Sequence, residues 1–310
     1  MKSGFVILDK PSGMTSRQAG WRVAKMFGQR KFGHIGTLDP MASGVLPIAL
    51  GEATKMIPYI ERNRNKVQES EKEYEFGIKW GIETDTGDTD GNIIEQQESP
   101  LIPNPESLIP IFAELIGEIE QTPPAYSAIK IGGRKAYELA RAGHAVEMPK
   151  RQVVIEDLGI RNQEPSIRYY VKCSAGTYVR TIVQQIVERL NKSLIPDTWY
   201  LATCDMIRRT QSNGFEIKDS IALDLLENIY NNSAADAEKY LRPVDFGLDD
   251  ILVLELNEMD AMRFANGQTV TSNQLSVTSG LIRIYNNDKF IGIGKLESGL
   301  LKAKRVINNN

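Results

Sequence analysis

The feature that most constrains this chain is the segment 33–55, which reads GHIGTLDPMASGVLPIALGEATK. Its first half is rich in glycine and proline, and Asp39 is its one acid before Glu52. Glycine permits backbone conformations that other residues resist, and Pro40 fixes its own φ and restricts the residue before it. The apolar run VLPIAL has the length of a buried strand. We therefore expect a tight loop that presents Asp39, followed by a strand. Taken alone, the pattern favours an ordinary turn aspartate that caps backbone N–H groups.

The complete string resembles the catalytic motif of the TruB family of pseudouridine synthases, which modify uridine in the T-loop of tRNA. The family pattern runs Gly-His-x-Gly-(Thr/Ala)-Leu-Asp-Pro-x-Ala-x-Gly-x-Leu and closes with Gly-x-Ala-Thr-Lys. The chain matches it at Gly33, His34, Gly36, Thr37, Leu38, Asp39, Pro40, Ala42, Gly44, Leu46, Gly51, Ala53, Thr54 and Lys55. The resemblance implies that Asp39 is the catalytic nucleophile. It also implies that His34 fills the space that the target base vacates; the alternative is a turn histidine that bonds the backbone.

Two further segments resemble motifs of the same family. DKPSGMTS, at 9–16, is similar to a segment that braces the active-site loop, and we expect the same support here. Tyr74 begins an alternating run to Trp80, which by itself favours a core-facing strand residue. However, Lys72-Glu73-Tyr74 followed by Thr84-Asp85-Thr86 resembles the motif whose tyrosine stacks on the target base. The resemblance implies that role for Tyr74, and its hydroxyl could also assist removal of the C5 proton.

The string CSAGTYVR, which ends at Arg180, resembles the family motif Cys-Ser-x-Gly-Thr-Tyr-(Ile/Val)-Arg. An arginine near a helix start is usually solvated, but an opposite charge beside a sequestered Asp39 would favour its ionised form. We therefore expect an ion pair between Arg180 and Asp39. The chain then departs from the family, with Gln185-Ile186-Val187 in place of Asp-Leu-Gly and a longer stretch before the segment 206–210. The wall behind Arg180 is expected to differ from the common pattern.

Composition excludes several classes of protein. The 310 residues are 41% hydrophobic and 25% charged, which is ordinary for a soluble globular protein, and no apolar run approaches the length of a membrane span. Two cysteines provide no disulfide framework, so we expect a reducing compartment, the cytoplasm. With only two histidines a Cys/His zinc site is nearly excluded, and DTGDTDG at 85–91 fails the EF-hand pattern. We expect no metal, and no cofactor, because isomerising uridine is not a redox reaction.

Charge is unevenly distributed along the chain. The net charge is only −3, yet 10–38 contains six basic residues and no acid, 130–151 is also basic, and 219–260 is acidic. One face could therefore bind RNA phosphates despite the acidic total, although each run could also be a solvated helix face. Besides His34, the expected RNA contacts are Lys10, Arg17, Lys31, Lys130, Arg134, Lys135, Arg141, Arg208 and Arg209.

Periodicity and turn residues predict the secondary structure. We expect strands at 4–9, 74–80 and 167–179, a hairpin turn at 85–91, and helices and connections over 219–245. Thr15 and Gln18 predict a capping box for a helix that ends near Phe27. Further helices are expected over 105–119 and from Arg180, and Gly132-Gly133 should join a short strand to a basic helix. In the tail, 281–285 and 289–296 should form a hairpin.

These elements predict an α+β fold with a mixed, largely antiparallel sheet and an RNA-binding cleft. We expect a catalytic domain over 1–246, in which about 123–150 is a segment that moves to grip RNA. The remaining 247–310 resembles the small PUA-like β-barrel that ends many RNA-modifying enzymes. The expected function is that of a stand-alone, monomeric synthase acting on uridine 55 in the T-arm of tRNA. A guide-RNA-dependent relative and a non-catalytic tRNA-binding or RNA-folding protein are the alternatives.

Overall fold

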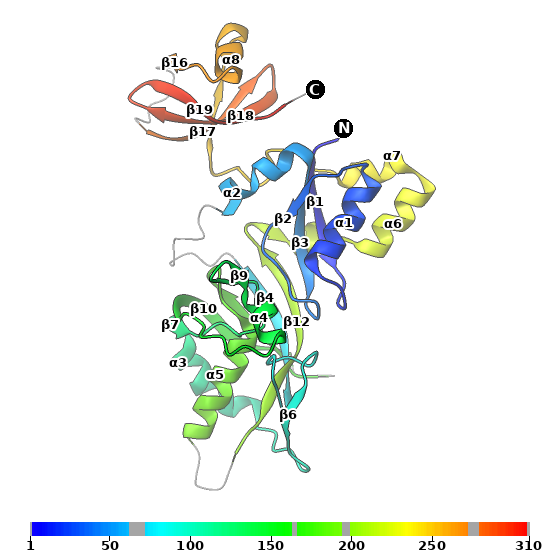
Figure 1. Ribbon diagram of the computed structural model, residues 1–310, viewed down its shortest axis with the longest axis vertical. Helices are drawn as coiled ribbons and strands as arrows, with labels where there is room; N and C mark the ends of the chain where they lie inside the picture. Colours follow the sequence, from blue (N-terminus) through cyan, green and yellow to red (C-terminus); the bar gives the residue numbers. More distant parts are fainter. Residues whose placement is uncertain (1, 62–71, 163–165, 194–198, 272–278, 309–310) are drawn as a thin grey trace.

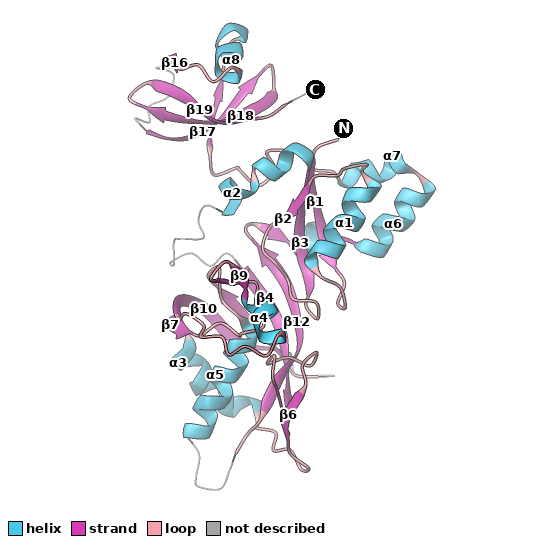
Figure 2. Cartoon of the chain, in the orientation of Figure 1, coloured by secondary structure: helices cyan, strands magenta, loops and turns pink. Residues whose placement is uncertain are grey.

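The computed structural model describes residues 2–61, 72–162, 166–193, 199–271 and 279–308. They form a large mixed sheet with helices against it and a second, smaller sheet at one end of an elongated molecule (Figure 1; Figure 2). Within these residues, no helix is both long and apolar enough to cross a membrane.

The large sheet has ten strands and confirms the expected mixed, largely antiparallel arrangement. Its main path runs β14-β1-β3-β12-β4-β11-β10-β7, with β2 on β3 and β13 on β12, and only β1·β14 and β3·β12 are parallel. The bounds are β1 (Gly4–Lys10), β2 (Phe32–His34), β3 (Ser43–Leu50), β4 (Lys72–Trp80), β7 (Gly117–Gln121), β10 (Arg151–Asn162), β11 (Arg168–Cys173), β12 (Ala202–Ser212), β13 (Phe215–Glu216) and β14 (Ile221–Ala222).

Two helices that position the site follow from local sequence. Helix α1 (Ser16–Met26) begins at the expected capping box, in which Thr15 and Gln18 bond each other's backbone N–H groups. Helix α5 (Val179–Lys192) buries Ile182, Ile186 and Leu190, which recur at helical spacing. Both apolar faces belong to the main core cluster, together with β4 and β11.

Short elements surround the sheet. The helices are α2 (Ile57–Ile60), α3 (Ile109–Leu115), α4 (Ala136–Arg141), α6 (Leu223–Asn232) and α7 (Ala234–Ala237). Single 3₁₀ turns are η1 (Gly51–Lys55), η3 (Pro105–Leu108), η4 (Ile217–Asp219) and η5 (Glu238–Tyr240). The expected hairpin around 85–91 is confirmed by the pairing of β5 (Ile82–Thr84) with β6 (Ile93–Gln96), and a second small hairpin pairs β8 (Lys130–Ile131) with β9 (Arg134–Lys135).

The second sheet confirms the strand-rich tail. It has the order β15-β17-β18-β19-β16, and α8 (Glu258–Ala265) packs against it. The strands are β15 (Leu252–Glu255), β16 (Val270–Thr271), β17 (Ser279–Asn286), β18 (Lys289–Glu297) and β19 (Leu300–Val306). Asn287 and Asp288 have positive φ, as a type I′ hairpin turn requires. A separate apolar cluster contains Phe5 of the large sheet and Phe290 of the small one, so the two sheets share a core.

Three expected elements were wrong in part. The helix over 105–119 ends at Leu115, because Gly117 opens β7 with a φ of 108°. The strand over 167–179 ends at Cys173, and the rest of the motif is a loop that leads into α5. Gly132-Gly133 is the turn of a β-hairpin and not a strand-to-helix joint.

Candidate active site

The loop between β2 and β3 carries Asp39 and is held by hydrogen bonds from the segment 9–16. The Leu38 N–H donates to Ser16 Oγ at 2.8 Å, and this hydroxyl donates to the Leu38 carbonyl at 3.0 Å. Ser12 Oγ donates to the Met41 carbonyl at 2.8 Å, and the Gly13 N–H donates to the Pro40 carbonyl at 2.8 Å. The segment 9–16 therefore braces the loop, as expected from the sequence.

Arg209 of β12 supports the same loop from the interior. Its Nε donates to the Val45 carbonyl and its Nη2 donates to the Gly36 carbonyl, both at 2.8 Å. This contact explains Gly36 of the motif, because φ is 66° there and a Cβ would lie 3.0 Å from Arg209 Nη1. Gly44 is required for the same reason: its φ is 104°, and a Cβ would lie 2.2 Å from the Arg209 carbonyl oxygen.

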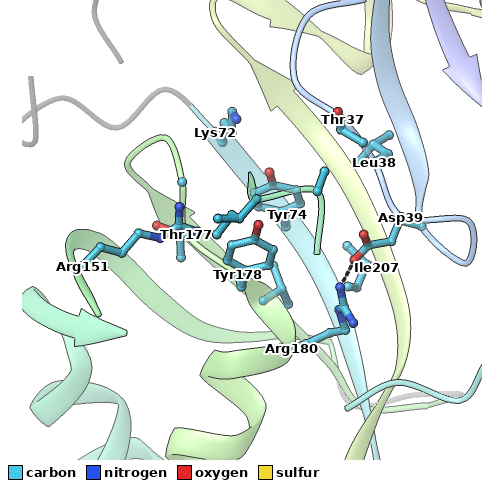
Figure 3. Close-up of a pocket in the computed structure, with 15 residues that line it drawn as sticks. Thr37, Leu38, Asp39, Lys72, Tyr74, Arg151, Thr177, Tyr178, Arg180 and Ile207 are labelled. Carbon is cyan, nitrogen blue, oxygen red and sulfur yellow. Dashed lines mark ion pairs between the residues drawn. The ribbon is translucent and has the colours of Figure 1, made fainter. Parts of the chain in front are cut away.

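Arg180, on the first turn of α5, forms an ion pair with Asp39 of the β2–β3 loop. Arg180 Nη2 lies 2.8 Å from Asp39 Oδ2, and the Arg180 side chain is only 3% exposed (Figure 3). The guanidinium also donates from Nη1 to the Thr86 carbonyl at 2.7 Å and from Nη2 to the Tyr126 carbonyl at 3.1 Å. The expected ion pair is present, and it is anchored by two loops that are distant in sequence.

Asp88 is a site residue that sequence reasoning missed. Its Oδ2 lies 3.2 Å from Arg180 Nη1, and Asp88 is buried. Its other oxygen accepts hydrogen bonds from Thr86 Oγ1 at 2.7 Å and from the Asp90 N–H at 3.1 Å. Arg180 is therefore shared by two carboxylates. Asp88 stands in the acidic turn 85–91, where nothing in the local pattern distinguishes it from Asp85 or Asp90.

The ionisation of Asp39 is set by opposing effects. Burial raises the pKa of Asp39 above its ordinary value, Arg180 acts against this shift, and the Asp88 charge adds to it. The Asp39 side chain is 32% exposed, and Asp39 lines the adjacent cavity. Lys10, the last residue of β1, also acts to lower the pKa of Asp39 through its charge. Its Nζ donates to the Met14 carbonyl at 2.6 Å, and burial lowers the pKa of Lys10 itself to about 8.

Tyr74 lies on β4 and faces the same cavity. Its side chain is 7% exposed, and burial raises the pKa of Tyr74 to about 12, so the hydroxyl is a neutral phenol at physiological pH. Arg209 hydrogen-bonds the Tyr74 side chain. The same buried arginine thus supports both the Asp39 loop and the tyrosine.

A cavity of about 260 Å³ joins these groups. Asp39 and Arg180 lie on one side of it, Arg151 lies on the other, and the rings of Tyr74 and Tyr178 stand between them in Figure 3. Ala128 and Ile129 contribute to the wall, so the segment 123–150 borders the cavity. Within the described residues, no group of three or more His, Cys, Asp or Glu side chains is arranged to hold a metal ion.

Two of the expected RNA contacts are wrong. Lys10 and Arg209 are both fully buried, and their charged groups bond backbone carbonyls, so neither side chain can reach a phosphate. Charged residues usually lie at the surface, which is why the sequence alone suggests RNA binding for them. Arg208, next in the chain, forms a two-point ion pair with Asp9 at 2.7 and 3.1 Å and remains partly exposed.

The other expected contacts are accessible. Six basic residues have exposed side chains: Arg17, Lys31, Lys130, Arg134, Lys135 and Arg141. His34 is half-buried at the end of β2, and its Nε2 bonds Thr37 Oγ1 at 3.2 Å and not the backbone. Burial lowers the pKa of His34, and the positive charge of Arg209 acts in the same direction. His34 is not among the residues that line the cavity.

Comparison with known proteins places these features in a family. Residues 24–179 match the model of the TruB family pseudouridylate synthase N-terminal domain, and residues 253–307 match the pseudouridine synthase II TruB C-terminal model. A protein of Stutzerimonas stutzeri named tRNA pseudouridine synthase B is 36% identical over 99% of this chain and 96% of its own length. A protein of the same name from Bradyrhizobium diazoefficiens is 38% identical over 98% of this chain and 86% of its own.

Solved structures share the fold at lower identity. A chain in the structure titled H/ACA RNP bound to a substrate RNA containing 2′-deoxyuridine superimposes with a TM-score of 0.65. The match covers 98% of this chain and 85% of that one, at 20% identity.

Proposed function

Because the chain belongs to the TruB family of pseudouridine synthases, we propose that it isomerises uridine 55 in the T-loop of tRNA, with Asp39 as the nucleophile. The observation that carries the proposal is the 2.8 Å ion pair between Asp39 and a buried Arg180 at the wall of a cavity that Tyr74 also lines. A sequestered carboxylate opposed by a guanidinium suits covalent attack better than it suits turn capping.

The reaction requires a nucleophile but no oxidant or group donor. The N1–C1′ bond breaks, the base rotates, C5 joins C1′, the C5 proton leaves and N1 gains a proton, so atoms and electrons balance within the nucleoside. A carboxylate can form a covalent intermediate of this kind. Attack by Asp39 on C1′ of the sugar and attack on C6 of the base both fit its place at the cavity wall. In either case Arg180 stabilises the ionised form of Asp39 that must attack.

Tyr74 is proposed to stack on the extruded base. A base must leave its helical stack before an enzyme can act on it, which costs a few kcal/mol, and aromatic rings commonly receive such bases. Assistance by the Tyr74 hydroxyl in removing the C5 proton is the additional role that Tyr74→Phe would test.

The RNA backbone is proposed to lie along the segment 123–150, with His34, Arg17, Lys31 and Arg208 as further contacts. Four exposed cations occur on β8, β9 and α4, beside a stretch that borders the cavity: Lys130, Arg134, Lys135 and Arg141. Replacing all four with Gln should weaken tRNA binding and flatten its salt dependence, by roughly 0.7 to 0.9 logarithmic units of slope for each lost contact. A Lys218/Lys239→Gln variant, altered far along the chain, is the control.

We also propose that the protein acts as a monomer in the cytoplasm. A catalytic domain over 1–246 and a C-terminal domain over 247–310 agree with the presence of two separate sheets.

The decisive experiment uses purified protein and an unmodified tRNA transcript labelled with tritium at C5 of uridine. Tritium is released when C5 joins C1′, and a transcript with cytidine at position 55 reports the site. A stand-alone synthase converts the bare transcript, a guide-dependent enzyme does not, and a non-catalytic RNA-binding protein retains tRNA without releasing tritium. Absence of release under conditions in which tRNA is bound would disprove the proposed activity.

A further inference from the structure

Arg151, the first residue of β10, has an unusual environment at the side of the cavity remote from Asp39. Its guanidinium carbon lies 4.6 Å from the centroid of the Tyr178 ring, close enough for a cation–π contact. The guanidinium also lies against the backbone turn at Gly176, where a Cβ would be 3.4 Å from Arg151 Nη1, an ordinary contact distance. Figure 3 shows the side chain extending from the strand toward Thr177 and Tyr178.

The positive charge of Arg151 is not matched by a protein group in the described chain. Its Nε and Nη2 atoms are shielded from solvent, yet neither has a hydrogen-bond partner among the described residues. No described carboxylate lies within ion-pair distance of it either, whereas Arg180 has two. Shielding a guanidinium without a partner is unfavourable. The uncommon feature is therefore an arginine that stacks on Tyr178 while its Nε and Nη2 donors have no partner among the described residues.

We propose that Arg151 binds a phosphate oxygen of the RNA backbone next to the target uridine. The Nε and Nη2 donors form the fork that matches two oxygens of one phosphate, and Tyr178 holds this fork in place. Within a nucleotide, uracil and ribose are neutral, so the phosphate is the group that can compensate the charge. Asp39, Tyr74 and Arg151 line one cavity, so a nucleotide bound there can bring a phosphate beside the target uridine within reach of Arg151.

This inference rests on the proposed function and names one contact of that substrate. Because both donors are shielded in the free protein, the phosphate reaches them only after a rearrangement of the guanidinium or of the residues that cover it. The competing explanation is that Arg151 only clamps the Tyr178 ring. A clamp would influence every substrate equally, whereas a phosphate ligand responds to the charge of one particular phosphate.

The test uses T-arm stem-loop RNAs that carry one neutral methylphosphonate, placed either 5′ or 3′ of the target uridine. Binding and single-turnover rates are measured for the wild type, Arg151→Gln and Arg168→Gln. Arg168 is a suitable control because it is a partly buried arginine on the neighbouring β11 that does not line the cavity. Thermal unfolding verifies that each variant is folded.

For the wild type and Arg168→Gln, one of the two methylphosphonates should reduce affinity or rate by roughly tenfold or more, as expected for loss of a charged hydrogen bond. In Arg151→Gln this penalty should disappear, and the salt slope should decrease by roughly 0.7. If Arg151→Gln does not fold, Arg151→Lys replaces it and should show a reduced penalty.

An equal penalty in wild type and variant, or no penalty at either position, would overturn the contact. Failure of the proposed function is distinguishable, because the wild type would then form no pseudouridine in the unmodified stem-loop.

Discussion

Replacement of Arg209 by Gln tests whether this residue supports the active-site loop or touches RNA. Arg209 is fully buried, and its Nε and Nη2 donate to the Val45 and Gly36 carbonyls at 2.8 Å each. A weaker bond of 3.4 Å reaches the Ile35 carbonyl. Gln is shorter and uncharged, so it cannot reach these carbonyls from β12.

The expected loss follows from the number of bonds. A hydrogen bond from a charged donor contributes roughly 1.5–3 kcal/mol, so two short bonds together contribute about 3–6 kcal/mol. Gln avoids burying an unpaired charge, which reduces the loss, and we expect about 3–5 kcal/mol of unfolding free energy. The neighbouring Arg208→Gln is the matched control: its ion pair with Asp9 is partly exposed, so its removal should cost about 1 kcal/mol or less.

Urea denaturation of the two variants gives both free energies directly, and tRNA affinity across a salt series separates support from RNA contact. If Arg209→Gln unfolds no more readily than Arg208→Gln, or if it is fully stable and only lowers the salt slope, the supporting role is refuted.

Further predictions concern the cavity. Asp39→Asn should abolish pseudouridine formation while tRNA binding persists, since an amide is a poor nucleophile; turnover by verified, undeamidated protein would argue against the assignment. Asp88→Asn should lower the rate constant of the chemical step roughly tenfold or more by releasing Arg180, and an unchanged single-turnover rate would remove Asp88 from the site. Tyr74→Phe should stay active if stacking dominates, whereas Tyr74→Leu should not; equal activity of Tyr74→Leu and wild type would assign the residue to the core. The pKa of Asp39 is raised on folding, so the folded protein binds this proton more tightly than the unfolded chain does. The free energy of unfolding of the wild type should therefore increase relative to that of Asp39→Asn as the pH falls through the raised pKa. If the difference between these two free energies is constant from about pH 4 to pH 8, the prediction is wrong.

Sequence reasoning succeeded where a motif or a strict period was present. The loop that carries Asp39, the capped helix α1 and the apolar face of α5 all follow from adjacent residues. It missed β10 and β12, because both strands contain register shifts that interrupt the period-two alternation. Bulges of this kind depend on the partner strand and leave little signal in one sequence.

The set of site residues predicted from the sequence was incomplete for a related reason. Asp88 and Arg180 are far apart in the chain, and only the folded sheet brings their side chains within 3.2 Å. Lys10 and Arg209 are charged, so the sequence predicts that they lie at the surface. In the structure both are buried and donate hydrogen bonds to carbonyls of the Asp39 loop. Burial of a charged side chain is a property of its tertiary partners, and these are not encoded by neighbouring residues.

The sharing of Arg180 between two carboxylates has a consequence for the course of a catalytic cycle. If Asp39 becomes esterified, it loses its negative charge. If Arg180 had no other carboxylate partner, its buried guanidinium would then be unpaired while the covalent intermediate exists. Asp88 Oδ2 lies 3.2 Å from Nη1 of the same guanidinium, and this contact does not depend on Asp39. A covalent intermediate on Asp39 would therefore form and decay beside an Arg180 that still has a carboxylate partner.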